Sequence, residues 1–105
     1  MKLTNAEKWL LDRRRSSCSQ RQYALAWGLS LRDYQRVEAG EKILPRSAVP
    51  RVTALRGSER CLIMRLRAGW TQQRVAQEAG WCRRWVMLME TGRAPCHELI
   101  AFWEC

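Results

Sequence analysis

Arginine supplies most of the chemically active side chains in this sequence. The chain has 19 Lys and Arg residues against 10 Asp and Glu, which gives a net charge of +9 at pH 7 over 105 residues. Such an excess favours a polyanionic partner, either a nucleic acid or an anionic membrane face. Guanidinium groups bind phosphate oxygens and guanine edges through paired hydrogen bonds, so contact with nucleic acid is the chemistry these residues favour.

Residues suited to catalysis or metal binding are few. His97 is the only histidine, and it lies far in sequence from any nucleophile it could activate. The five cysteines are scattered without a Cys-x-x-Cys pair, and the adjacent Cys96 and His97 are poorly spaced as ligands of one zinc ion. We therefore expect free thiols, no metal, no cofactor and no enzymatic activity.

A membrane location is not indicated by the sequence. No apolar run approaches the ~20 residues that cross a bilayer. Residues 1–7 also lack the apolar core of a signal peptide. We expect a cytoplasmic protein, associated with the nucleoid if it binds DNA.

The sequence repeats itself at an offset of 52 residues, with no gap from residue 7 to residue 40. Identical pairs include Leu10 and Leu62, Arg13 and Arg65, Arg15 and Arg67, Gln20 and Gln72, Ala24 and Ala76, Gly28 and Gly80, Arg32 and Arg84, Glu38 and Glu90, and Gly40 and Gly92. We expect two units, residues 1–56 and 57–105. The link at residues 56–58 is short, so the units should pack together.

Apolar residues at helical spacing predict four helices in the first unit. Their expected ranges are 3–15, 20–27, 31–39 and 47–55. Ser19 and Ser30 are suited to cap the second and third helices, and Gly28 is suited to end the second. Pro50 fits the first turn of the fourth helix, and Trp27 is expected in the core.

The second unit repeats this plan. Helices are expected over 59–67, 72–79, 83–90 and 95–103. Thr71 is suited to cap the second of them, and Gly80 provides the turn into the third. Leu62, Ile63 and Leu66 are expected to face inward from the first. Both units are therefore predicted to be all-α.

One motif occurs at matched places in the two units. It runs Gln72-x-x-Val75-Ala76-x-x-Ala79-Gly80 and Val86-x-x-Met89-Glu90-x-Gly92-Arg93 in the second, and Ser19-Gln20-x-x-Tyr23-Ala24-x-x-Trp27-Gly28 and Tyr34-x-x-Val37-Glu38-x-Gly40 in the first. This pattern resembles the helix-turn-helix of the lambda-repressor/Cro-like family, also called the XRE family. The resemblance implies an all-α protein of two tandem four-helix units packed as a pseudo-dimer.

The resemblance also implies which residues contact DNA, because the third helix of this family enters the major groove. The implied base contacts are Leu31, Arg32, Asp33, Gln35 and Arg36 in the first unit, and Arg83, Arg84, Trp85, Met87 and Leu88 in the second. The candidates for phosphate contact are Gln20, Arg21, Lys42, Gln72, Arg74 and Arg93, together with Arg13, Arg14 and Arg15. Arg32 and Arg84 suit guanine.

Glu38 and Glu90 are expected to act structurally, since a carboxylate repels phosphate. Each should pair with an arginine of the first helix, such as Arg13 or Arg65. Trp85 is expected to face solvent. Stacking on a deoxyribose and packing in a protein interface remain equal alternatives for it.

The resemblance implies a transcriptional regulator of phage, plasmid or bacterial type, often a repressor, that binds double-stranded DNA. One chain would supply two recognition helices, acting as a pseudo-dimeric monomer or as part of a homodimer. The alternative is a helix-turn-helix scaffold that binds and inhibits another protein, such as a host protein that handles nucleic acid. Trp85 and the apolar residues 87–89 favour that alternative.

Overall fold

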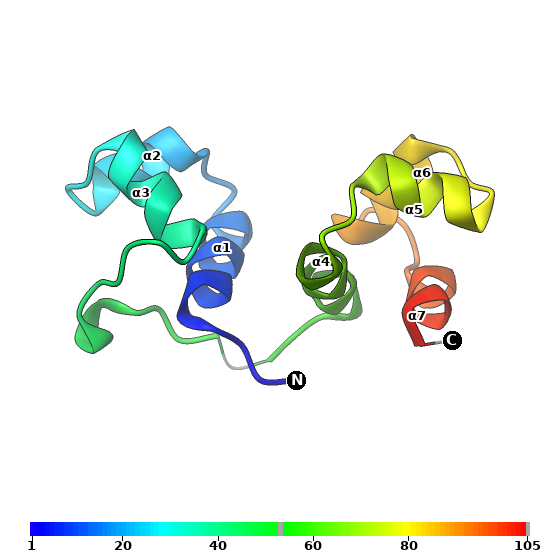
Figure 1. Cartoon of the computed structure of the whole chain (residues 1–105), viewed down its shortest axis with the longest axis horizontal. Coiled ribbons are helices and arrows are strands. Elements are labelled where there is room, and N and C mark those ends of the chain that lie inside the picture. The colour runs from blue at the N-terminus through cyan, green and yellow to red at the C-terminus, as the bar shows by residue number, and fades with distance from the viewer. Residues whose placement is uncertain (53, 105) are drawn as a thin grey trace. The chain divides into compact units, whose positions relative to one another are not determined.

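The computed structural model describes residues 1–52 and 54–104, and within these residues it contains helices and no strand. The all-α fold expected from the sequence is therefore confirmed. Contacts divide the chain into two compact units, Met1–Thr53 and Ala54–Cys105 (Figure 1). The expected link at residues 56–58 is not a linker, because Gly57 and Ser58 belong to a helix of the second unit.

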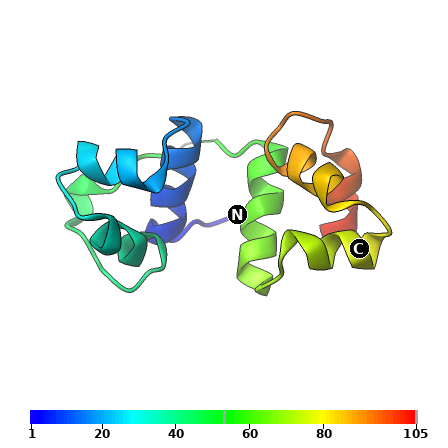
Figure 2. The same ribbon diagram turned by 90° about the horizontal axis from the view of Figure 1, so that it is seen from above.

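The first unit, hereafter unit 1, is built from three α-helices and one short 3-10 helix. These are α1 (Asn5–Arg15), α2 (Gln20–Ala26), α3 (Leu31–Glu38) and η1 (Arg46–Ala48). Both α1 and α2 pack against α3, as the two ribbon views show (Figures 1 and 2). Ser19 and Ser30 cap α2 and α3 as expected, each accepting a hydrogen bond from a backbone N–H three residues on.

The second unit, unit 2, has four α-helices. These are α4 (Gly57–Ala68), α5 (Gln72–Ala79), α6 (Arg83–Glu90) and α7 (His97–Glu104). Helix α5 packs against α6, and α4 packs against both α6 and α7. Thr71 caps α5 through its hydroxyl oxygen, as predicted.

The turns that join α2 to α3 and α5 to α6 have the same geometry. Gly28 and Gly80 adopt φ values of +70° and +75°, a left-handed conformation that glycine takes without steric cost. The next residue then donates a backbone hydrogen bond of 2.9 Å back into the preceding helix, Leu29 to Ala24 and Trp81 to Ala76. The same glycine turn therefore joins both helix pairs.

The helix expected over residues 47–55 is absent, and that prediction is wrong. Only η1 forms there, and the described residues that follow it before α4 are irregular; Thr53 lies outside the described residues. Pro50 lacks an N–H, and its ring disfavours helical backbone at Val49 before it. The described residues of unit 1 therefore form three α-helices and not the four expected.

The core of unit 1 is aromatic. Trp9, Tyr23 and Tyr34 are buried, with ring centroids 5.2–6.3 Å apart. Trp27 packs edge-on to Trp9 at 4.8 Å but remains 43% exposed, so its expected core position is only partly realised.

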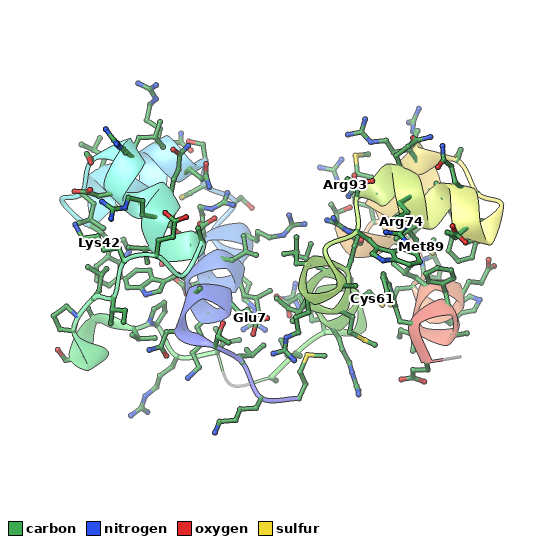
Figure 3. All side chains as sticks on the ribbon, viewed as in Figure 1. Glu7, Lys42, Cys61, Arg74, Met89 and Arg93 are labelled. Atoms are coloured by element: carbon green, nitrogen blue, oxygen red, sulfur yellow. The ribbon has the colours of Figure 1, made fainter. Side chains whose placement is uncertain are left out.

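Unit 2 fills the matched core positions differently. Cys61, Val75 and Val86 stand where unit 1 has Trp9, Tyr23 and Tyr34. These three residues are smaller than the aromatic residues of unit 1, and α7 fills the remaining volume with Leu99, which is fully buried in the core. Cys61 and Met89 belong to the same core (Figure 3). Leu66, expected to face inward, is 44% exposed, because α4 directs Cys61, Leu62 and Ile63 to the core instead.

Truncating Leu99 tests how much unit 2 depends on α7. Leu99→Ala should lower the free energy of unfolding by about 2–5 kcal/mol, since it leaves a cavity in a core that α7 completes. Leu25→Ala is the matched control, because Leu25 is 80% exposed on α2. Urea unfolding followed by circular dichroism provides the measurement, and equal losses for the two variants would contradict the role of α7.

Candidate nucleic-acid interface

A clamp of three side chains fixes α3 in unit 1. Arg13 on α1 grips Glu38 at the end of α3 through two bonds, Nε to Oε2 at 2.6 Å and Nη2 to Oε1 at 3.3 Å. Gln20, the first residue of α2, donates its amide to the same carboxylate at 3.1 Å. The remaining Arg13 nitrogen, Nη1, donates to the carbonyl of Cys18 at 3.2 Å.

Unit 2 contains the same clamp 52 residues later. Arg65 binds Glu90 at 2.7 Å and 3.1 Å, and Gln72 donates to Glu90 at 3.1 Å. The Nη1 of Arg65 donates to the carbonyl of Trp70 at 2.9 Å. The expected pairing of Glu38 and Glu90 with Arg13 and Arg65 is confirmed in both units.

Each clamp joins the first three α-helices of its unit at one carboxylate. In unit 1, Tyr34 is buried beside this carboxylate, and its pKa is raised by burial and by Glu38. Desolvation lowers the pKa of Arg13, but the hydrogen bonds and the charge of Glu38 raise it by more, so the net shift of the pKa is upward. The outer face of the third helix is left for other contacts.

The outer face of α3 is polar and partly neutralised within the unit. Arg32 and Gln35 are exposed, and Leu31 is half-buried. Asp33 pairs with Lys42 at 3.2 Å, which lowers the pKa of that carboxyl group. Arg36 is exposed and only 4.0 Å from Glu41.

The outer face of α6 is more basic at its start and more apolar beyond. Arg83, Arg84 and Met87 are exposed, and Leu88 is half-buried. Trp85 is also half-buried and packs against the core of unit 2, so the expectation of a solvent-facing tryptophan is only partly met. Its ring completes the hydrophobic side of the helix.

The predicted phosphate contacts occupy varied environments. Arg21, Arg74 and Arg93 are exposed, and Figure 3 labels Arg74 and Arg93 on unit 2. Gln20 and Gln72 are half-buried and already donate within the clamps. Lys42 is committed to Asp33.

Arg13 also belongs to a clamp, so the prediction that it contacts phosphate is wrong. Both edges of its guanidinium group are used by Glu38 and by the Cys18 carbonyl. A side chain held in this way cannot also reach a phosphate group.

Sequence reasoning missed a cleft in unit 2. An open cleft of about 460 Å³ lies at the start of α5 and is lined by Arg65, Trp70, Thr71, Gln72, Gln73 and Arg83. Arg83, predicted as a base contact, thus stands beside the N-terminus of α5. Helix N-termini carry free N–H groups and a positive dipole, so this cleft suits an anion.

Trp70 was missed as well. The guanidinium carbon of Arg74 lies 4.0 Å from the centroid of the Trp70 ring, a cation–π arrangement that holds the arginine at the α5 surface. Trp70 itself packs against Phe102 and Trp103 of α7. The spacing of Trp70 and Arg74 was the available sequence signal. In unit 1 the matched residues are Cys18 and Gln22, which cannot form this pair.

The thiols of the described residues are unpaired cysteines. Burial raises the pKa of Cys61 to about 12, so this thiol stays protonated and unreactive. No group of three His, Cys, Asp or Glu residues placed to hold a metal ion occurs among residues 1–52 and 54–104. None of the helices described is long and apolar enough to span a bilayer.

No protein-family model, curated protein or solved structure matches this chain. The functional assignment therefore depends on the geometry of its own residues.

Removing the charge of one clamp tests its structural weight. Three donors converge on the Glu90 carboxylate, which is wholly buried, so Glu90→Gln would turn an NH₂ group towards other donors. We expect a loss of about 3–5 kcal/mol in the free energy of unfolding. Glu41→Gln, at an exposed pair 4.0 Å apart, should change it by less than about 1 kcal/mol. Similar urea midpoints for both variants would show that the clamp does not stabilise the fold.

Proposed function

We propose that this chain is a sequence-specific DNA-binding transcriptional regulator in which units 1 and 2 are tandem helix-turn-helix units. It would act as a pseudo-dimer, with α3 and α6 as two recognition helices supplied by one chain. A lambda-repressor/Cro-like repressor of phage, plasmid or bacterial type is the kind of protein that this arrangement suggests. Steric occupation of an operator is the mechanism we assign to it.

The start of α6 is the observation that carries this proposal. Arg83 and Arg84 are exposed in its first turn, where positive charge opposes the helix dipole. Its N-cap residue, Cys82, makes no side-chain capping bond, and neither α5 nor α6 has an acidic residue in its first turn. This local arrangement costs stability in the free protein and favours a bound anion.

Phosphate and base contacts would then come from neighbouring side chains. The cleft at the start of α5 places Thr71, Gln73 and Arg83 around one position suited to a phosphate group. Arg74 of α5, held on Trp70, adds a second cation. Arg84 is left to pair with a guanine edge.

The two recognition helices differ, so the proposed DNA target is asymmetric. The α3 surface offers Arg32 and Gln35 beside the Asp33–Lys42 pair, whereas the α6 surface offers two arginines and then Met87. Apolar side chains contact thymine methyl groups, and amides contact adenine. One chain should therefore prefer two different half-sites.

Arg84→Ala tests the base contact. On DNA sites selected from a random pool, we expect a loss of about 1–3 kcal/mol in binding free energy and relaxed preference at one base pair. Arg60→Ala is a matched control, because Arg60 is an exposed arginine of α4 and its loss changes the net charge equally. Uniform weakening across all sequences would make Arg84 a phosphate contact only. Equal effects of the two substitutions would contradict the proposed interface.

Salt dependence tests the electrostatic part independently. If about six phosphates are neutralised, the logarithm of the binding constant should fall with the logarithm of salt concentration with a slope of about −5. Fluorescence anisotropy on the selected site, between about 50 and 200 mM salt, provides the measurement. A slope near zero would contradict DNA binding by this basic chain.

A further inference from the structure

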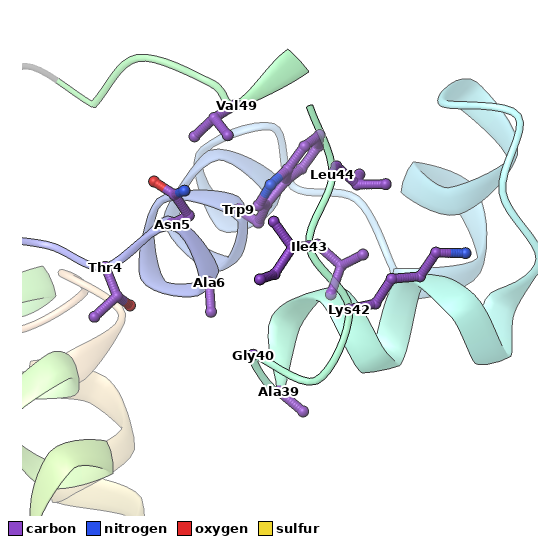
Figure 4. Close-up of a pocket in the computed structure, with 11 residues that line it drawn as sticks. Thr4, Asn5, Ala6, Trp9, Ala39, Gly40, Lys42, Ile43, Leu44 and Val49 are labelled. Carbon is purple, nitrogen blue, oxygen red and sulfur yellow. The ribbon is translucent and has the colours of Figure 1, made fainter. Parts of the chain in front are cut away.

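An apolar groove lies open on unit 1. It has a volume of about 450 Å³ between the start of α1, the end of α3 and the chain from residue 39 to residue 49 (Figure 4). The residues that line it are Thr4, Asn5, Ala6, Trp9, Val37, Ala39, Gly40, Lys42, Ile43, Leu44 and Val49. Ile43, which lines this groove, is 87% exposed.

Unit 2 shows what occupies the matched place in this scaffold. There α7 packs against α4, and Ile100 and Cys96 lie so close to Gly57 that a Cβ atom at Gly57 would be 2.9 Å and 3.0 Å from them. Gly57 and Cys61 are the counterparts of Asn5 and Trp9, which line the groove of unit 1. The groove is therefore the position that a helix fills in unit 2.

Among its described residues, unit 1 has no α-helix of its own for this position. The counterparts of Leu99 and Ile100 are Ser47 and Ala48, which lie at η1 and are too small to fill the groove. Pro50 prevents the local chain from continuing as a helix. The groove stays open although Leu44 and Ala48 pack against the neighbouring core.

We propose that this groove binds one short amphipathic helix of another protein, apolar on the face that docks and acidic on the other. The apolar face follows from the groove lining and from the Leu99 and Ile100 pair that fills the same place in unit 2. The acidic face follows from charge. Residues 1–53 carry eleven Lys or Arg against five Asp or Glu, a net positive charge that favours an acidic partner. Helix α7 has this composition, with Glu98 and Glu104 as its acidic residues.

This surface is separate from the proposed DNA contacts. Apart from Lys42, none of the residues that line it is among the predicted base or phosphate contacts. Helix-in-groove recognition depends on a few apolar anchors at helical spacing. The proposal holds whether or not the chain binds DNA.

The test uses a fluorescein-labelled peptide of residues 95–104 as the probe helix. Cys96→Ser prevents oxidation, and a side-chain lactam joining positions 97 and 101, both exposed in α7, keeps the peptide helical. Anisotropy with the full chain should show binding. The same peptide carrying Ile100→Asp should bind at least about tenfold more weakly, which is about 1.4 kcal/mol.

Variants of the full chain locate the site. Ile43→Glu should weaken binding of the peptide about tenfold. Leu25→Glu is the matched control, because Leu25 is also a large aliphatic residue and is 80% exposed outside the groove; it should change the affinity by no more than about twofold. Asn5→Gly should tighten binding several-fold, because it reproduces the close approach that Gly57 allows in unit 2.

Three outcomes would overturn the proposal. Absence of binding, even with Asn5→Gly, would show that the groove does not accept a helix. Binding that ignores Ile43→Glu would show that the peptide replaces α7 in unit 2 instead. Self-association of the full chain that Ile43→Glu abolishes, measured by sedimentation velocity, would make a second copy of this chain the occupant.

Discussion

One carboxylate in each unit sets the arrangement of three helices. Glu38 and Glu90 accept hydrogen bonds from an arginine of the first helix and a glutamine of the second. Because both acidic residues lie at the end of the third helix, that helix cannot rotate without leaving a buried charge unpaired. Every exposed residue of α3 and α6 owes its position to this constraint, whatever it contacts.

The two units show that this constraint tolerates very different cores. Unit 1 fills its interior with Trp9, Tyr23 and Tyr34, whereas unit 2 has smaller residues there and adds α7. Interiors must reach nearly constant packing density, so one helix can substitute for three aromatic rings. The clamp is polar and directional, and it therefore allows few substitutions. The core is apolar and adaptable, and it allows many.

The parts of the structure that were predictable from sequence depend on local chemistry or on the repeat. Ser19, Ser30 and Thr71 cap helices because their side chains act on backbone three residues away, and the internal repeat paired Glu38 with Arg13. The helix expected over 47–55 does not form, because Pro50 disfavours helical backbone in spite of the apolar spacing around it. The position of Trp85 and the cleft beside Arg83 depend on tertiary packing, which periodicity within one helix does not determine.

The sequences of the two units differ at positions outside the clamp. Arg13, Gln20 and Glu38 are repeated without change, whereas the outer faces of α3 and α6 share only one arginine position, Arg32 and Arg84. The units therefore differ in what their surfaces offer. Helix α6 begins with two exposed arginines and no side-chain cap, and unit 1 keeps a groove at the position that α7 fills in unit 2.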